Sequence, residues 1–389
     1  MSLETTVVAP QDRAHNRFAQ FMRLLVPSFK AHALIIALVI VFLACEYGTA
    51  ALLPEARTQN FATFSLGFVC SNMPILLIAV VTERFYYLVA HVRPKHPTIA
   101  LAREVARIIF NPQRAANALP LIIALSAFIG AFSFFKTNIP VIVPFHWDLT
   151  LDHLDRALHF GRLPWEWLQP VVGYAPVTFV LNVSYNLWFF VMWTMWVTFA
   201  LRAGPSQLRT RFFLSFVLIW SIGGALLAMV FSSAGPCYFE RLGLRPNPYA
   251  DLMDYLRHVD TILPIWAIKT QDLLWSGYLG QQNVVTGISA MPSMHNASTL
   301  LFALAGWQIN RKLGIVLSVY AGVIFVASVH LGWHYAVDGY LSYALTLAVW
   351  TLCGPLARWN ERQPWSRQFA EKTMSYSAAA RSLSSRAAR

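Results

Sequence analysis

Residues 33–53 read ALIIALVIVFLACEYGTAALL, an apolar run whose one charged side chain is Glu46. An α-helix needs about 20 predominantly apolar residues to cross the hydrocarbon core of a bilayer. The stretch therefore predicts a transmembrane helix. Further runs that meet or nearly meet this length are found at residues 61–82, 119–135, 175–201, 212–233, 293–309, 313–331 and 335–357. We expect an all-α, polytopic membrane helical bundle of about eight transmembrane helices.

The composition agrees with a membrane protein. The chain is 57% hydrophobic and 12% charged, and its mean hydropathy is +0.49. Soluble domains carry roughly a quarter charged residues. The 27 Phe, 14 Trp and 14 Tyr suit packed apolar cores and the aromatic belts at the two membrane surfaces. No cleavable signal peptide is apparent before the first apolar run.

The basic residues predict the orientation. Of the 30 Lys and Arg, 22 lie in the N-terminal segment, the 83–118 and 202–211 loops, Arg311-Lys312 and the C-terminal tail, and 8 lie in the alternate loops. Basic residues accumulate in cytoplasmic loops, so we expect both termini in the cytoplasm. The net charge of +12 then reflects orientation and contact with anionic lipid, and nucleic-acid binding is disfavoured.

The domain organisation follows from these runs. We expect a cytoplasmic N-terminal segment at residues 1–32 and an integral membrane domain at 33–357. A basic cytoplasmic tail at 358–389 should be disordered after Met374, where it becomes rich in Ser, Ala and Arg.

His334 and Asp338 begin the last apolar run, four residues apart, which places them on one helix face. The carboxylate can accept a hydrogen bond from one imidazole nitrogen and leave the other free to attack. A histidine nucleophile on phosphorus gives a phosphohistidine, which a second acceptor can discharge. The alternative is that His334 and Asp338 only form a hydrogen bond with each other and have no catalytic role. Charged groups in such segments are, however, usually functional.

Met291-Pro292-Ser293-Met294-His295 begins the 293–309 run on the same, extracytoplasmic side. Pro292 and Ser293 suit a first helical turn, with Ser293 as a cap. The free N–H groups of a helix N-terminus bind phosphate oxygens, and His295 can protonate a departing oxygen as general acid. Alone, this stretch is more often only a structural helix start; together with the His334 stretch it indicates catalysis.

These two stretches resemble the second and third motifs of the type 2 phosphatidic acid phosphatase superfamily. The chain is more narrowly similar to the branch that contains inositolphosphorylceramide synthases and their bacterial relatives, over roughly residues 140–355. The resemblance implies a helical bundle with a PAP2-like core of six helices that works without a metal or other cofactor. It also implies that His334 is the nucleophile, Asp338 its orienting partner and His295 the general acid.

The sequence departs from the superfamily pattern at basic positions. Ser328 stands six residues before the nucleophile, where the wider superfamily has an arginine. His330 could supply a phosphate donor instead, or could only pack. Tyr238 stands where the first motif has its lysine, although Arg245-Pro246 is present. Residues 235–241 look like the alternative first motif of the synthase-like branch, so Arg241 and Arg245 are either phosphate ligands or solvated loop residues.

Some other polar features have less weight. Residues 146–170, with His146, Asp148, Asp152, Asp155 and Arg156, predict an interfacial amphipathic helix. A solvated face is favoured there over a cover for the substrate. Residues 99–110 predict a basic amphipathic helix on the cytoplasmic surface. Tyr185 and Asn186 are assigned only to bonds with a neighbouring helix.

The sequence thus predicts phosphoryl transfer on a lipid phosphate or phospholipid, with Ser293, Arg241, Arg245 and His330 as candidate substrate-binding residues. The acceptor is water in a phosphatase or a lipid hydroxyl in a phosphotransferase. The short loops favour a bacterial inner membrane with the site facing the periplasm. A transporter or proton relay is the alternative, although no paired halves are visible. A metal site of His330, His334 and Asp338 is disfavoured because Gly332 interrupts the helix.

Overall fold

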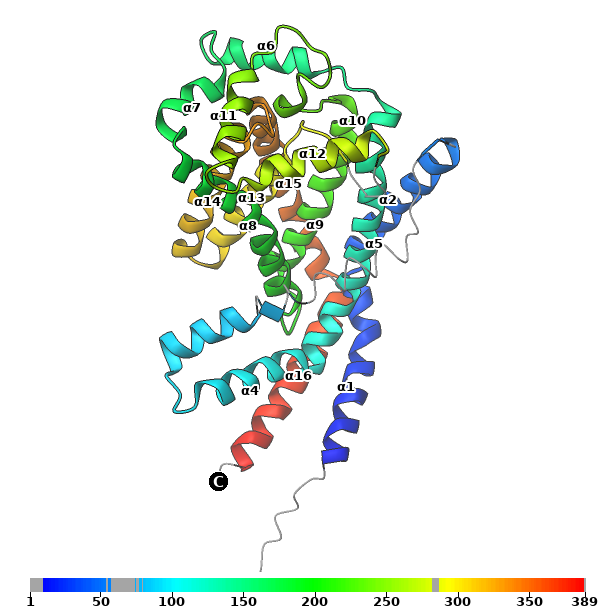
Figure 1. Cartoon of the computed structure of the whole chain (residues 1–389). Helices are drawn as coiled ribbons and strands as arrows, with labels where there is room; N and C mark the ends of the chain where they lie inside the picture. The colour runs from blue at the N-terminus through cyan, green and yellow to red at the C-terminus, as the bar shows by residue number, and fades with distance from the viewer. Residues whose placement is uncertain are drawn as a thin grey trace, which may run out of the picture.

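The computed structural model describes residues 10–53, 55–56, 74, 77–78, 80–281 and 287–387. Within these ranges the secondary structure is helical and contains no strand (Figure 1). The predicted all-α class is therefore confirmed.

Six helices of the described ranges are long and apolar enough to cross a membrane. One of them, at Gln207–Val230, is built from α9, the π-helical turn η2 and α10. The elements are α2 (Ala33–Leu52), α5 (Pro112–Ile142), α8 (Ala175–Ala200), α9 (Gln207–Ser221), η2 (Ile222–Leu227), α10 (Ala228–Val230), α14 (Arg311–His330) and α15 (Ala336–Arg362).

Two of the eight expected spans are not among these six. The stretch 61–82 lies largely outside the described residues. The helix α13 (Met294–Ile309) has 16 residues, a length of about 24 Å, which falls short of the hydrocarbon core. It packs against α14, α15 and α9, so its apolar residues serve the interior of the bundle.

Shorter helices cover one end of the bundle (Figure 1). They are α6 (Asp148–Leu158), α7 (Pro164–Val172), the 3-10 turn η3 (Pro236–Tyr238), α11 (Ala250–Asp260) and α12 (Trp266–Tyr278). The segment predicted as one helix at 146–170 is thus two helices, α6 and α7.

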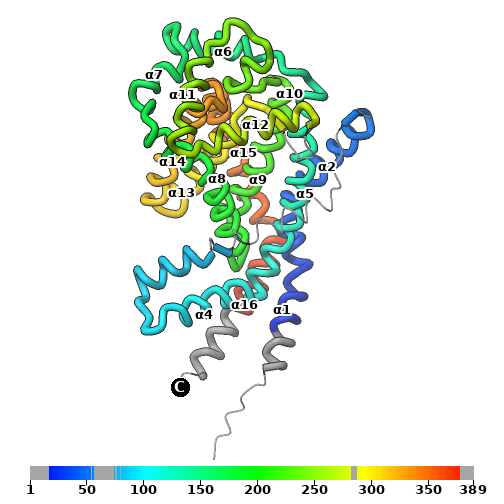
Figure 2. The backbone as a smooth tube through the Cα atoms, viewed as in Figure 1, coloured from blue at the N-terminus to red at the C-terminus, as the bar shows by residue number. Residues whose placement is uncertain are grey.

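Other helices extend from the opposite end, where the C-terminus also lies (Figure 2). They are α1 (Pro10–Ala31), the π-helical turn η1 (Leu88–Val92), α4 (Pro97–Ile109) and α16 (Pro364–Ala387). The amphipathic helix predicted at 99–110 corresponds to α4.

In the expected tail, α16 begins at Pro364 and continues to Ala387. One face of its first half is buried. Phe369 is fully buried in a cluster with Leu24 of α1 and Ala116 of α5, and Thr373 follows one turn later on the same side. Burial of this face against α1 offsets the low apolar content of the segment.

Glycines let the middle of the bundle close tightly. A Cβ on Gly224 of η2 would lie 2.6 Å from the Phe132 ring of α5, and one on Gly223 would lie 2.8 Å from Met294 of α13. Three elements far apart in sequence therefore meet beside one cavity.

Candidate active site

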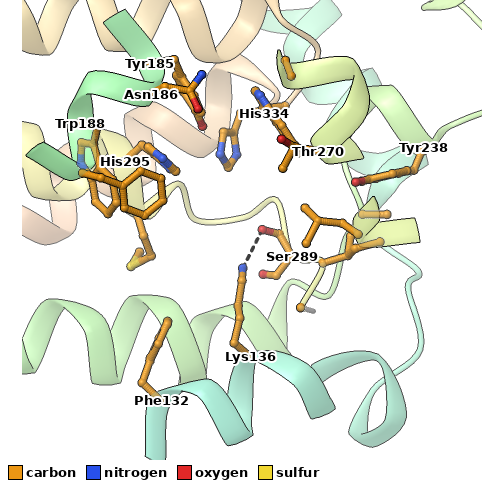
Figure 3. A pocket seen from close by; sticks show the side chains of 18 of the residues that line it. Phe132, Lys136, Tyr185, Asn186, Trp188, Tyr238, Thr270, Ser289, His295 and His334 are labelled. Atoms are coloured by element: carbon orange, nitrogen blue, oxygen red, sulfur yellow. Dashed lines mark hydrogen bonds between the residues drawn. The ribbon is translucent and has the colours of Figure 1, made fainter. Parts of the chain in front are cut away.

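A cavity of about 350 Å³ opens between the covering helices and the membrane-spanning helices. Both histidines of the predicted motifs line it, and Figure 3 shows their rings directed into it. Its other walls are mostly aromatic and apolar, and they include Phe132, Tyr185, Trp188, Phe189, Trp220, Leu274, Met294 and Trp333.

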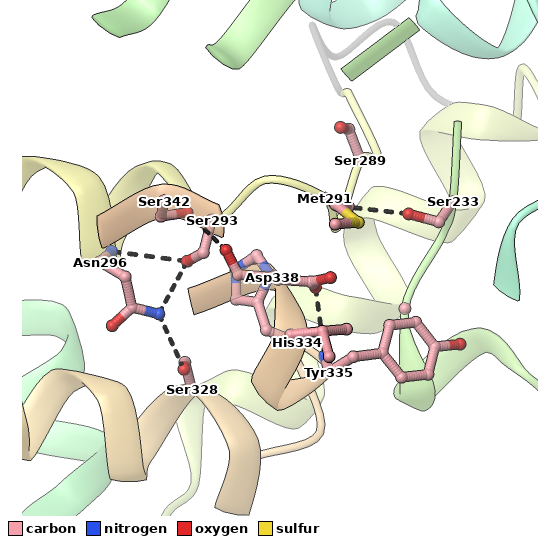
Figure 4. Close-up of polar contacts among 12 residues, drawn as sticks. Ser233, Ser289, Met291, Ser293, Asn296, Ser328, His334, Tyr335, Asp338 and Ser342 are labelled. Carbon is pink, nitrogen blue, oxygen red and sulfur yellow. Dashed lines mark hydrogen bonds and ion pairs between the residues drawn. The ribbon is translucent and has the colours of Figure 1, made fainter. Parts of the chain in front are cut away.

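His334 is held by its own backbone and by Asp338. Its N–H donates to the Ser328 carbonyl at 3.1 Å. Its ring Nδ1 lies 3.1 Å from Oδ2 of Asp338, and the same oxygen accepts the Tyr335 N–H at 3.1 Å (Figure 4). When Asp338 is ionised its oxygen can only accept, so this contact requires the hydrogen on Nδ1 and leaves the lone pair on Nε2.

The electrostatic surroundings keep His334 neutral. Burial, followed by the positive charge of Lys136, lowers the pKa of His334 to about 3. At neutral pH the imidazole is therefore uncharged, which is the state that a nitrogen nucleophile needs.

His295 sits in the first turn of α13 and is held by aromatic rings. It stacks on Tyr185 with centroids 4.3 Å apart and planes at 18°, and its centroid lies 4.2 Å from that of Trp188. These rings fix the orientation of the imidazole toward the cavity. Tyr185, assigned from the sequence only to helix–helix bonding, is thus part of the cavity wall.

Asn296 ties the two motifs together. Its side-chain amide donates to Ser293 Oγ and to Ser328 Oγ, both at 3.1 Å. Ser293 is the N-cap of α13, and Ser328 lies near the end of α14. The helix that carries His295 is thereby joined to the turn that carries His334 (Figure 4).

The α6 carboxylates point inward, contrary to the solvated face favoured from the sequence. Asp148 is 2% exposed and accepts from the backbone N–H groups of Ala234 and Gly235 and from the Tyr335 hydroxyl. Asp155 is also 2% exposed. It accepts from Ala336 at 2.8 Å and Val337 at 3.0 Å.

Asp155 therefore caps the N-terminus of α15, where free N–H groups need acceptors. Burial raises the pKa of Asp155 to about 7, and the nearby charge of Asp338 adds to the effect. The helix α6 thus holds the turn that carries His334 and Asp338 through the hydrogen bonds of Asp148 and Asp155. Its residues do not line the cavity.

The four candidate substrate-binding residues do not line the cavity. Arg241 is paired with Asp272, and Arg245 is exposed. Ser293 is fully buried, with its hydroxyl occupied by Asn296. His330 is fully buried and its Nε2 lies 2.9 Å from Thr178 Oγ1.

The cavity also contains a positively charged residue that the sequence motifs did not predict. Lys136 of α5 lines the cavity, and its Nζ donates to the Ser289 carbonyl at 3.0 Å (Figure 3). The available signal was a single Lys near the end of an apolar run, read there only as a loop residue. In the part of the chain that the structure describes, no group of three or more His, Cys, Asp or Glu is placed to hold a metal ion.

Comparison with known proteins gives one match. A family model described as the PAP2 superfamily matches residues 149–352, slightly more than half of the chain. The matched segment nearly coincides with the 140–355 region that the motifs predicted. Neither the curated proteins nor the solved structures contain a match to this chain.

Proposed function

The chain belongs to the PAP2 superfamily, and from that premise we propose that it is a membrane-embedded enzyme that transfers the phosphoryl group of a lipid-borne phosphate through a phosphohistidine at His334. The observation that carries this proposal is the shared cavity. Two histidines from different helix ends line it, and one of them is oriented by a buried carboxylate.

In the first step, Nε2 of His334 attacks phosphorus. The N–P bond forms as the bond from phosphorus to the leaving oxygen breaks. Burial lowers the pKa of His295, and the negative charge of the bound phosphate offsets this effect, so that the protonated ring gives its proton to that oxygen. Asp338 accepts the Nδ1–H bond throughout and stabilises the positive charge that develops on the His334 ring.

In the second step, an acceptor hydroxyl enters the cavity. Neutral His295 takes its proton, the new O–P bond forms, and the N–P bond breaks. His334 returns to its neutral state and His295 to its protonated state, so the cycle closes without a metal or cofactor.

The acceptor is either water or a lipid hydroxyl. The aromatic walls favour a lipid as occupant, because side chains such as Trp188, Phe189 and Trp220 bury apolar chains and exclude water. With a lipid hydroxyl the reaction would be that of an inositolphosphorylceramide-synthase-like phosphotransferase, and with water that of a lipid phosphatase.

We further propose that the cavity opens on the extracytoplasmic side of a bacterial inner membrane. The support is the distribution of basic residues: the helices α1, α4 and α16, which carry 10 of the 30 Lys and Arg, lie at the end of the bundle opposite the covering helices (Figure 1). The cavity lies between those covering helices and the membrane-spanning helices.

The test presents the purified full-length protein with lipid phosphates and with a phosphoinositide diester. Free phosphate and new phospholipid are measured separately by mass spectrometry. We expect His334→Ala and His295→Ala each to abolish turnover, while His258→Ala, which removes an exposed histidine of α11, leaves it unchanged.

Substrate labelled at phosphorus should leave an acid-labile, base-stable label on the wild type and none on His334→Ala. Normal turnover in either cavity variant would defeat the mechanism. Ion transport that persists in both variants would favour a transporter instead.

A further inference from the structure

Lys136 brings a positive charge into the cavity from outside the matched family segment. It belongs to α5, which ends at Ile142, whereas the match begins at residue 149. A Cβ on Gly287 would lie 2.3 Å from the Lys136 carbonyl oxygen. The close approach that this glycine permits holds the segment before Ser293 against α5 and the ammonium beside both histidines.

Among the described residues, no carboxylate pairs with this charge, because none of their ion pairs involves Lys136. The ammonium donates a hydrogen bond to a neutral backbone carbonyl, that of Ser289. An ammonium in an apolar cavity is costly unless an anion compensates it, and none of the described residues that line the cavity is acidic.

The rest of the cavity wall offers this charge no compensation, because it is mostly aromatic and apolar. A ligand with several acceptor oxygens and negative charge would compensate the ammonium.

The basic residues that the family resemblance implies for phosphate binding are either replaced in this chain or lie away from the cavity. Ser328 and Tyr238 occupy the positions of the expected arginine and lysine. Arg241 and Arg245 do not line the cavity. We therefore propose, on the basis of the proposed function, that Lys136 binds the phosphate group of the substrate.

The test measures anion binding rather than turnover. Full-length protein in detergent is titrated calorimetrically with dodecylphosphonate, whose P–C bond cannot be hydrolysed, and with inorganic phosphate. Loss of a charged hydrogen bond should weaken dodecylphosphonate binding by roughly 10- to 100-fold in Lys136→Met. Lys136→Arg, which keeps the charge, should bind much more tightly than Lys136→Met.

Lys269→Met is the matched control, because Lys269 is exposed on α12 and does not line the cavity. Its affinity should equal that of the wild type. Binding of inorganic phosphate with the same dependence on Lys136 would define the ligand as phosphate alone, whereas binding of only dodecylphosphonate would define it as a lipid headgroup. Should Lys136→Met not fold, by circular dichroism and gel filtration, Lys136→Gln takes its place.

Three results would each overturn the proposal. The first is wild-type affinity in Lys136→Met or Lys136→Gln, the second is equal weakening in Lys269→Met, and the third is no binding of either anion to the wild type. The outcome is separable from that of the proposed function. If dodecylphosphonate binds through Lys136 but His334→Ala retains turnover, the phosphohistidine mechanism fails and the anion site stands.

Discussion

The pair formed by His334 and Asp338 shows how one oxygen can set the chemistry of a ring. Oδ2 of Asp338 accepts both from Nδ1 of His334 and from the Tyr335 backbone. An acceptor at this position is therefore required twice, once for the tautomer and once for the start of α15.

Asp338→Ala should lower kcat by roughly 10⁴-fold, the scale of effect found when a histidine loses the carboxylate that fixes its tautomer. The substitution removes the acceptor for Nδ1 of His334, whereas an asparagine oxygen in the place of Oδ2 would accept from both donors and keep the tautomer. Turnover of a lipid phosphate, with dodecylphosphonate affinity measured alongside, is the readout. Asp254→Ala, at an exposed site on α11, serves as control; turnover of Asp338→Ala within about tenfold of the wild type would refute the tautomer role.

Asp155 should make folding stability depend on pH. Its pKa is about 7 in the folded protein and 3.8 as the ordinary value, so between these pH values the folded state binds a proton that the unfolded state has lost. The contribution of Asp155 to stability therefore falls as pH rises from about 4 to 7, and is constant above that.

His334 acts in the opposite direction, because its lowered pKa adds stability as pH rises through the same range. We therefore compare the wild type with Asp155→Asn, so that the contribution of His334 cancels. The Tm of the wild type minus that of Asp155→Asn should decrease between pH 4 and pH 7. A difference that stays constant or increases would show that Asp155 is not protonated in the folded protein.

At the scale of elements, the cavity depends on the contact between α5 and the segment that precedes α13. Gly287 touches the Lys136 backbone, while Ser289 accepts from the Lys136 side chain. The match to the family covers this segment but not α5, so the contact joins the matched part of the chain to the helices before it.

Gly287→Ala should disturb this contact, because the new Cβ would meet backbone atoms of Lys136 that have no rotamer through which to move away. A displacement of about 1 Å at a reacting centre costs up to roughly 100-fold in rate, and we expect a loss of this order in kcat/KM together with weaker dodecylphosphonate binding. Gly322→Ala in α14 is the control, since a Cβ there meets nothing within 4 Å. Equal activity of the two variants would exclude a role for the Gly287 contact.

For the whole molecule, the bundle has two unlike ends. The covering helices lie at one end, and the basic helices α1, α4 and α16 extend from the other (Figure 2). The cavity lies below the covering helices. Asymmetry of basic charge sets the orientation of membrane proteins, so the cavity end is expected outside the cytoplasm.

Single-cysteine labelling checks this orientation. In a chain whose four natural cysteines are replaced, Lys269→Cys on α12 should react with a membrane-impermeant maleimide on intact cells. Arg103→Cys on α4 should react only after the cells are permeabilised; both positions are exposed. The reverse pattern would place the cavity in the cytoplasm.

Much of the fold was predictable because its signals are local. Apolar runs of membrane-spanning length gave α2, α5, α8, α14 and α15, since burial of the backbone in lipid requires helices. The contact between His334 and Asp338 was also local, although its geometry differs from the predicted shared helix face: His334 lies just before α15, which begins at Ala336, and its ring meets Asp338 of the first turn.

The contacts across the bundle were decided by tertiary structure. Sequence could not place Lys136 beside His334, seat His295 on Tyr185, or turn Asp155 inward to cap α15. Each of these joins residues on helices distant in the chain, and which faces of such helices meet depends on how side chains and glycines of the whole bundle pack. A periodic pattern records only that a residue is on a helix, whereas the packing determines what lies opposite it.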